Sequence, residues 1–189
     1  FIDLGSGFKV PYQDGDVATD INLLGVKVTE AFRAFEKETG KKIQVWFEPG
    51  KYLVSESGYF IVKANVIKQT TATVFVGVNS GFNHLIRPMF YDAYHRISNI
   101  TNPNGSERIY TVVGNICETD TFAWDRTLNE VREGDFLVFF NAGAYGFAMA
   151  AYRHAERFAR DQEPVHNAAL HAAAYQRAQQ FGNDGQVFD

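Results

Sequence analysis

Two short apolar segments with a long helical pattern between them open this chain, and this arrangement limits its fold most strongly. FIDL at residues 1–4 and KIQVWFEPG at residues 42–50 have the character of buried strands. From about Ile21 to Thr39, apolar residues recur at helical spacing, and Gly40 follows as a natural helix end. Strand, helix and strand in this order predict two parallel strands. Two strands do not make a stable sheet alone, so we expect this unit to be the last part of a larger α/β domain.

From Gly58 onward the sequence changes to β-rich segments that are separated by turns such as NPNG. No long helical pattern lies between these segments. They predict an antiparallel β domain, a barrel or a sandwich, over residues 58–150, which leaves the α/β part to residues 1–57. The segments are YFIVKANVIKQ (59–69), TATVFVGVN (71–79), ERIYTVVGNIC (107–117) and DFLVFFNAGAYG (135–146).

The last segment, residues 151–189, differs from the rest in composition and predicts an atypical helical tail. It is rich in alanine, arginine and histidine, contains no lysine, and is interrupted by Pro164. An out-of-frame reading of a gene and a fusion would each give such a tail. We expect no metal site there, because the spacings of His154, His166 and His171 fit no usual helical ligand pair.

The overall composition indicates a globular protein and argues against several classes of function. Hydrophobic residues make up 46% of the 189 residues and charged residues 21%. A net charge of −4 argues against a nucleic-acid surface, and no apolar run reaches the length of a membrane helix. The first ten residues have no basic segment or cleavage site typical of a secretion signal. A single cysteine excludes an internal disulfide, so we expect a reduced, cytoplasmic setting.

Two loops of the N-terminal unit contain residue types that bind anions. Gly5, Ser6 and Gly7 follow the first apolar segment and could offer backbone N–H groups to an anion, although a plain turn has the same composition. Glu48 ends the second apolar segment and is followed by a Pro-Gly turn and Lys51. This pairing of charges could bind a zwitterionic or phosphorylated ligand, and an ordinary surface turn is the alternative interpretation.

Four further positions are candidates for binding or catalysis. Arg87 and Tyr91 are four residues apart and would share one face of a helical turn, where Arg87 could bind a carboxylate or phosphate. An ion pair of Arg87 with Asp92 is the alternative. Tyr145 lies among small residues at a strand end, where it could reach a ligand or pack in the core. Cys117 could be a reactive group or a buried structural thiol.

Several segments, taken together and in order, resemble the C-terminal part of the diaminopimelate decarboxylases. These enzymes belong to the fold type III, pyridoxal-phosphate-dependent amino-acid decarboxylases. The resemblance covers about residues 1–150 and rests on LGSGF, EPGKYLV, FVGVNSGFNHLIRPMFYDAYH, VVGNICETDTF and GDFLVFFNAGAYGFAM. It implies that residues 1–57 are the C-terminal remnant of a (β/α)8 barrel that binds the cofactor. Residues 58–150 would then be the antiparallel β domain that follows this barrel.

The resemblance also implies the cofactor, pyridoxal 5'-phosphate, and the positions that would bind it. Glu48 would pair with the pyridinium nitrogen, which keeps the ring protonated. Lys51 stands where the family usually has arginine, beside the phosphate and the substrate carboxylate, so the charge is kept but the two-point contact is lost. The corresponding positions in full are Gly5, Ser6, Gly7, Glu48, Gly50, Lys51 and Tyr145.

In this family two subunits of a homodimer share each active site, and the resemblance extends this arrangement to Cys117 and Glu118. Both would enter the active site of the partner subunit. Cys117 would help to protonate the carbanion, and Glu118 would bind the distal amino group of the substrate. The remaining positions that correspond to substrate ligands are Lys51, Arg87, Tyr91 and Tyr145.

The implied reaction is decarboxylation of meso-2,6-diaminopimelate to L-lysine and CO2, the last step of lysine biosynthesis. Glutamate after the cysteine favours this substrate, because ornithine decarboxylases more typically have Cys-Asp. Ornithine, arginine and carboxynorspermidine are the alternative substrates, and a non-catalytic binding protein is the alternative class. The eight lysines run from Lys9 to Lys68, and none lies in the motif that holds the family's Schiff-base lysine. We therefore expect this chain to be an incomplete fragment that is inactive alone.

Overall fold

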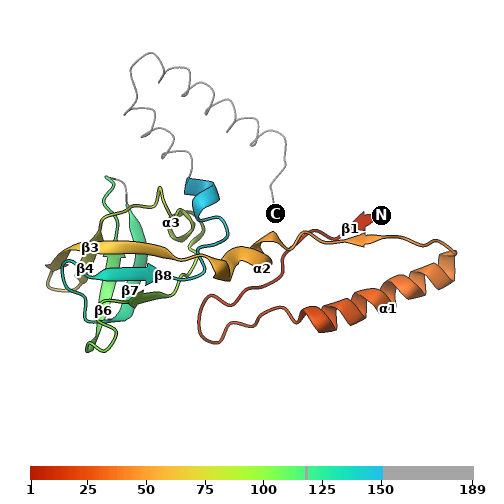
Figure 1. Ribbon diagram of the computed structural model, residues 1–189, viewed down its shortest axis with the longest axis horizontal. Helices are drawn as coiled ribbons and strands as arrows, with labels where there is room; N and C mark the ends of the chain where they lie inside the picture. Colours follow the sequence, from red (N-terminus) through yellow and green to blue (C-terminus); the bar gives the residue numbers. More distant parts are fainter. Residues whose placement is uncertain (118, 151–189) are drawn as a thin grey trace, which may run out of the picture.

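The computed structural model describes residues 1–117 and 119–150, and its N-terminal part contains the predicted strand, helix and strand (Figure 1). Strands β1 (Ile2–Asp3) and β2 (Val45–Trp46) pair in parallel, which confirms the prediction. Helix α1 (Ile21–Thr39) lies between them in sequence. Asp20 begins this helix by accepting a hydrogen bond from the Leu23 amide, and Gly40 ends it in the left-handed conformation.

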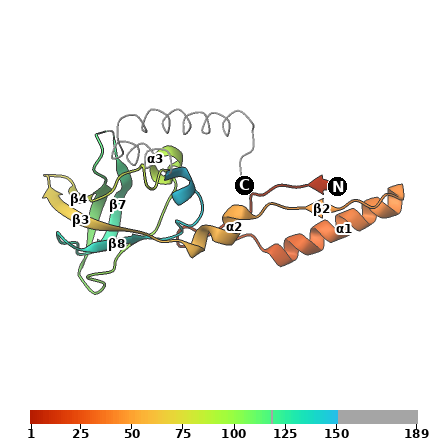
Figure 2. The same cartoon turned by 45° about the horizontal axis from the view of Figure 1, so that its top comes forward.

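Helix α1 keeps its apolar side uncovered within the described part of the chain. None of its residues is buried, and four apolar side chains are between 37% and 54% exposed: Ile21, Leu23, Val26 and Phe35. Figures 1 and 2 show that α1, β1 and β2 extend away from the larger sheet. An amphipathic helix is normally stabilised by packing of its apolar face, so α1 needs a partner that the described residues do not provide.

A short helical connection leads from this unit into a six-stranded sheet. The connection consists of α2 (Gly50–Val54) and the 3-10 turn η1 (Ser55–Ser57). The edge strands of the sheet, β5 and β7, contact each other, so the sheet is nearly closed. Its order is β5 (Ile97–Asn99), β8 (Phe136–Phe139), β3 (Phe60–Gln69), β4 (Val74–Val78), β6 (Glu107–Val113) and β7 (Thr121–Asn129).

The prediction of a purely antiparallel domain is wrong for one pair of strands. Strands β4 and β6 run in parallel, with Phe75 opposite Thr111, and all other pairs in this sheet are antiparallel. The long segment between β4 and β6 is the physical reason, because it contains helix α3 (Arg87–Tyr91) and strand β5 and returns the chain to the same end of the sheet. The sequence patterns located β3, β4, β6 and β8, but β5 and β7 were not predicted.

Buried side chains from the strands form one core inside this nearly closed sheet. Phe60, Phe122 and Phe139 form an aromatic cluster with ring centroids between 5.2 and 5.9 Å apart. The core also contains fully buried aliphatic and aromatic side chains, including Val62, Val76, Leu85, Tyr110, Val112 and Leu137. This core gives a rigid base to the loops that carry the candidate site.

The predicted helical tail at residues 151–189 and Glu118 lie outside the described residues. Within residues 1–117 and 119–150, no helix combines the length and apolar character needed to cross a lipid bilayer. The same residues contain no group of three or more histidine, cysteine, aspartate or glutamate side chains placed to hold a metal ion.

Candidate functional site

The glycine loop and Glu48 meet at the carboxyl ends of the two parallel strands. The two segments stay hydrogen-bonded beyond the ends of β1 and β2. The Glu48 amide donates a hydrogen bond to the Gly5 carbonyl over 2.8 Å. Gly5 and Gly7 have φ angles of +67° and +103°, a region that favours glycine. The Gly5 amide itself donates to the Asp3 carboxylate at 2.8 Å. Two motifs that are far apart in sequence are therefore adjacent, as the parallel pairing predicts.

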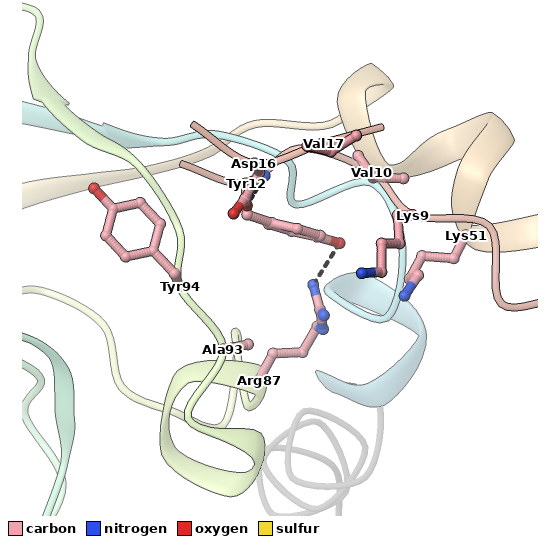
Figure 3. Close-up of a pocket in the computed structure, with 9 residues that line it drawn as sticks. All are labelled: Lys9, Val10, Tyr12, Asp16, Val17, Lys51, Arg87, Ala93 and Tyr94. Atoms are coloured by element: carbon pink, nitrogen blue, oxygen red, sulfur yellow. Dashed lines mark hydrogen bonds between the residues drawn. The ribbon is translucent and has the colours of Figure 1, made fainter. Parts of the chain in front are cut away.

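A basic cavity of about 410 Å³ lies between the segment after the glycine loop, helix α2 and helix α3 (Figure 3). Two predicted ligand residues, Lys51 and Arg87, line it together with Lys9, which the sequence did not indicate. Among the described residues that line it, Asp16 is the only acidic one. Three cations and one carboxylate give the cavity an excess of positive charge, which suits an anionic ligand. The other lining residues are Val10, Tyr12, Val17, Ala93 and Tyr94.

The Asp16 carboxylate is already engaged by the protein backbone. It accepts hydrogen bonds from the Tyr12 and Gln13 amides at 2.9 and 3.1 Å. These bonds, the one from Tyr12 first, lower the pKa of Asp16 below its ordinary value. Asp16 is therefore ionised at neutral pH and fixes the turn.

Tyr12 connects Arg87 to helix α2 and was missed by the sequence analysis. The Arg87 Nη1 atom donates a hydrogen bond to the Tyr12 hydroxyl at 2.8 Å, and the guanidinium carbon lies 4.9 Å from the centre of the Tyr12 ring. The same hydroxyl is 3.2 Å from Ser55 Oγ, at the start of η1. The sequence offers one indication of a role for Tyr12, which is its position directly after Pro11 and downstream of the glycine loop.

Two predicted ligand residues, Tyr91 and Tyr145, do not line this cavity. Tyr91 ends helix α3 and is 60% exposed, with its ring 6.0 Å from the Phe90 ring. Tyr145 is half-buried in a turn and has a φ angle of +56°. This turn packs closely on η1, since the Gly143 amide donates to the Ser55 carbonyl at 3.0 Å and a Cβ at Gly143 would overlap the Val54 carbonyl oxygen. The structure thus places both tyrosines near the elements that line the cavity but outside it.

Cys117 lies in an exposed loop that a buried carboxylate organises. The thiol is free and exposed, and Cys117 does not line the basic cavity. Asp120 is 5% exposed and accepts hydrogen bonds from the Phe82 amide at 2.8 Å and the Ile116 amide at 3.0 Å. Its backbone carbonyl also accepts from the Gly114 amide at 2.7 Å. Asp120 therefore ties the loop before Cys117 to the loop after β4.

A second cavity, of about 420 Å³, separates helix α3 from strand β7, the strand that follows Cys117. Its wall combines apolar side chains, such as Met89 and Trp124, with the charged side chains of Asp92 and Arg126. Within one chain, Arg87 and the residues that follow Cys117 therefore line different cavities.

His95 is a buried histidine next to the basic cavity and is held in its neutral form. Its Nδ1 atom lies 2.8 Å from the Phe140 carbonyl and donates to it, and its Nε2 atom is buried without a hydrogen-bond partner among the described residues. Burial is the main cause that lowers the pKa of His95 below the ordinary value of 6.5, and repulsion from Arg87 and Arg126 lowers this pKa further. The ring also packs edge-on against Tyr12, with centroids 5.6 Å apart.

We predict that His95 makes the chain less stable as the pH falls below about 6.5. The unfolded chain takes up a proton there and the folded chain resists it, so protonation favours unfolding. Urea unfolding between about pH 7.5 and 5.5 should show a decline in the free energy of unfolding that is smaller in His95→Gln. An identical decline in both proteins would show that His95 does not cause it.

Comparison with known proteins agrees with the six-stranded sheet. Residues 51–143 match the model of the pyridoxal-dependent decarboxylase C-terminal sheet domain, and this part of the chain belongs to that family. The similar curated proteins are diaminopimelate decarboxylases. That of Methanothermobacter thermautotrophicus is 40% identical over 155 residues, and that of Archaeoglobus fulgidus is 37% identical over 153 residues. Each match covers 80% of this chain and 36% of the relative.

Solved structures show the same relationship. The crystal structure of diaminopimelate decarboxylase from M. jannaschii aligns with a TM-score of 0.74 and 32% identity, over 80% of this chain and 35% of that chain. A second structure of the M. jannaschii enzyme, in co-complex with L-lysine, aligns with a TM-score of 0.72. This chain therefore spans little more than a third of the relatives that it matches.

Proposed function

We propose that residues 1–150 are the C-terminal part of a diaminopimelate decarboxylase, which converts meso-2,6-diaminopimelate to L-lysine and CO2. The basic cavity carries this proposal, because it brings Lys51 and Arg87 together at the junction of the two structural units. The names of the relatives and the L-lysine complex of one of them support the substrate. Cytoplasmic location is part of the same proposal.

In this proposal residues 1–57 are the end of the cofactor-binding (β/α)8 barrel and residues 58–150 are the β domain. The parallel pair β1 and β2, joined through α1, supports the first part. The uncovered apolar side of α1 also supports it, because the rest of a barrel would cover this side. Folding of the N-terminal unit would then depend on barrel strands outside this sequence.

The residues at the strand ends fit pyridoxal 5'-phosphate. Glu48 and the glycine loop are adjacent, as the two ends of one cofactor site would require. Lys9 and Lys51 follow these two motifs in sequence and line the basic cavity, where they supply cations for a phosphate. Glu48 would hold the ring nitrogen, and Gly5, Ser6, Gly7, Gly50, Lys51 and Tyr145 would hold the phosphate. When bound, the cofactor supplies an electron sink for the bond to CO2.

Arg87 and the loop at Cys117 would have different roles toward the substrate. Arg87, with Tyr91, would bind a substrate carboxylate, since a guanidinium matches a carboxylate in geometry and charge. Cys117 and Glu118 would serve the active site of the partner subunit in a homodimer, with the Cys117 thiol giving up a proton to the substrate carbon and Glu118 binding the distal ammonium group. The exposure of Cys117, outside the basic cavity of its own chain, supports a role in another subunit.

The proposal predicts that the 189-residue chain alone, supplied with pyridoxal 5'-phosphate, releases no CO2 from meso-diaminopimelate. The reason is chemical, because none of its lysines lies in the motif of the family's Schiff-base lysine and efficient turnover needs that amine. Release of labelled CO2 from carboxyl-labelled substrate measures the activity. Turnover by the isolated chain would contradict the proposal, because one of its own lysines would then have to serve as the Schiff-base lysine.

A further inference from the structure

Tyr12 lines the basic cavity together with Lys51 and Arg87, two cationic residues that bind ligands in the proposed function. It belongs to the segment after the glycine loop, 75 residues before Arg87 in sequence. Figure 3 shows its hydroxyl group pointing at the Arg87 guanidinium within the basic cavity. Tyr12 is therefore the contact through which the N-terminal unit can set the position of a side chain on helix α3.

The hydrogen bonds around Tyr12 have only one consistent direction. A guanidinium has donors and no acceptor, so Arg87 donates and the Tyr12 oxygen accepts, at 2.8 Å. The Lys51 carbonyl only accepts, so the Ser55 hydroxyl donates to it, at 2.7 Å. The Tyr12 proton then points to Ser55 Oγ, over 3.2 Å. The result is a donor chain from Arg87 through Tyr12 and Ser55 to the backbone of Lys51.

The two middle members of this chain, Tyr12 and Ser55, are held by the surrounding structure. Ser55 is fully buried, so its hydroxyl group cannot exchange its partners for water. The Tyr12 ring is fixed on two sides, by the Arg87 guanidinium at 4.9 Å and by the His95 ring at 5.6 Å. A tyrosine fixed in this way presents its oxygen at a constant place, which restricts the rotamers open to Arg87.

We propose that Tyr12 is a positioning residue, which orients the Arg87 guanidinium in the basic cavity and couples it to helix α2 at Lys51. The proposal rests on the proposed function, because that function gives Arg87 a carboxylate to bind. Tyr12 contacts no substrate in this account and acts through Arg87. A pre-oriented guanidinium binds an anion more tightly, because less side-chain freedom is lost on binding.

The test compares Tyr12→Phe with Tyr59→Phe in residues 1–150 of this chain, placed in a hybrid enzyme in which they replace the matching C-terminal part of the Methanothermobacter relative. The hybrid supplies the barrel strands on which folding of the N-terminal unit depends. Both changes remove one phenolic hydroxyl, but Tyr59 is 60% exposed and its ring packs on Phe140, outside the cavity. Nitrogen-15 NMR of arginine side chains reports whether the Arg87 guanidinium rotates. We expect slow rotation, with separate Nη signals, in the unaltered hybrid and in Tyr59→Phe, and rapid rotation with merged signals in Tyr12→Phe. Rapid rotation in the unaltered hybrid, or slow rotation in Tyr12→Phe, would overturn the proposal.

A titration with acetate, as a simple carboxylate probe, separates this proposal from the proposed function. We expect Tyr12→Phe to weaken acetate binding by about 3- to 10-fold and Tyr59→Phe to leave it unchanged. Equal affinity in all three proteins would overturn the positioning role. If acetate shifts no signal of Arg87 in the unaltered hybrid, the carboxylate site of the proposed function fails. The NMR comparison still decides the role of Tyr12 in that case, because it needs no ligand.

Discussion

Replacing Asp120 with alanine should lower the free energy of unfolding by about 2 to 6 kcal/mol. The carboxylate accepts hydrogen bonds from the Phe82 and Ile116 amides in a buried position. Alanine would leave both donors without this acceptor, and each unsatisfied buried donor costs about 1 to 3 kcal/mol. Urea unfolding, monitored by tryptophan fluorescence, measures the change.

Two further variants separate this effect from a general loss of charge. Glu107→Ala removes an exposed carboxylate at the start of β6 and should change the free energy of unfolding by less than about 0.5 kcal/mol. Asp120→Asn keeps one acceptor oxygen, so its free energy of unfolding should lie between those of Asp120→Ala and Glu107→Ala. If Asp120→Ala is as stable as Glu107→Ala, then Asp120 does not organise the loop that carries Cys117.

Replacing Arg87 with methionine should lower decarboxylation of meso-diaminopimelate by about 100- to 1,000-fold in kcat/KM. The assay uses a hybrid enzyme, in which residues 1–150 of this chain replace the matching C-terminal part of the Methanothermobacter relative, which is 40% identical. Methionine keeps much of the side-chain volume but removes the charge that would hold the substrate carboxylate. Steady-state release of CO2 gives kcat and KM.

Arg108→Met is the matched control for this prediction. Arg108 lies on β6 and donates to the Gln69 side chain at 2.8 Å, in an exposed position outside the basic cavity. This variant should keep the activity of the hybrid. A hybrid with Arg87→Met that matches the Arg108→Met hybrid in kcat/KM would show that Arg87 binds no essential part of the substrate.

Local patterns in the sequence were sufficient to predict the N-terminal unit. The apolar period of the segment from Ile21 to Thr39 and the glycine after it matched the ends of α1, because capping chemistry acts over a few residues. Strand β7 was missed because charged residues, Asp125 and Arg126, interrupt its apolar pattern. The parallel pairing of β4 with β6 depends on the path of a long connection, which no local pattern records.

The candidate site shows the same division between local and long-range information. Lys51 and Arg87 were predicted as ligands from their residue types and from the resemblance, and the structure places both in one cavity. Tyr12 and Asp120 were not predicted, because their partners are distant in sequence: Arg87 and Ser55 for Tyr12, and Phe82 for Asp120. A tyrosine or an aspartate without a known partner has no distinctive pattern in one sequence.

Substrate preference of the hybrid enzyme tests the central claim most directly. The hybrid, loaded with pyridoxal 5'-phosphate, would be assayed with meso-diaminopimelate, ornithine, arginine and carboxynorspermidine under the same conditions. Our account predicts release of CO2 from meso-diaminopimelate and at least about 100-fold lower kcat/KM with the other three substrates. A folded, cofactor-loaded hybrid that prefers ornithine, arginine or carboxynorspermidine, or that decarboxylates none of the four, would contradict it.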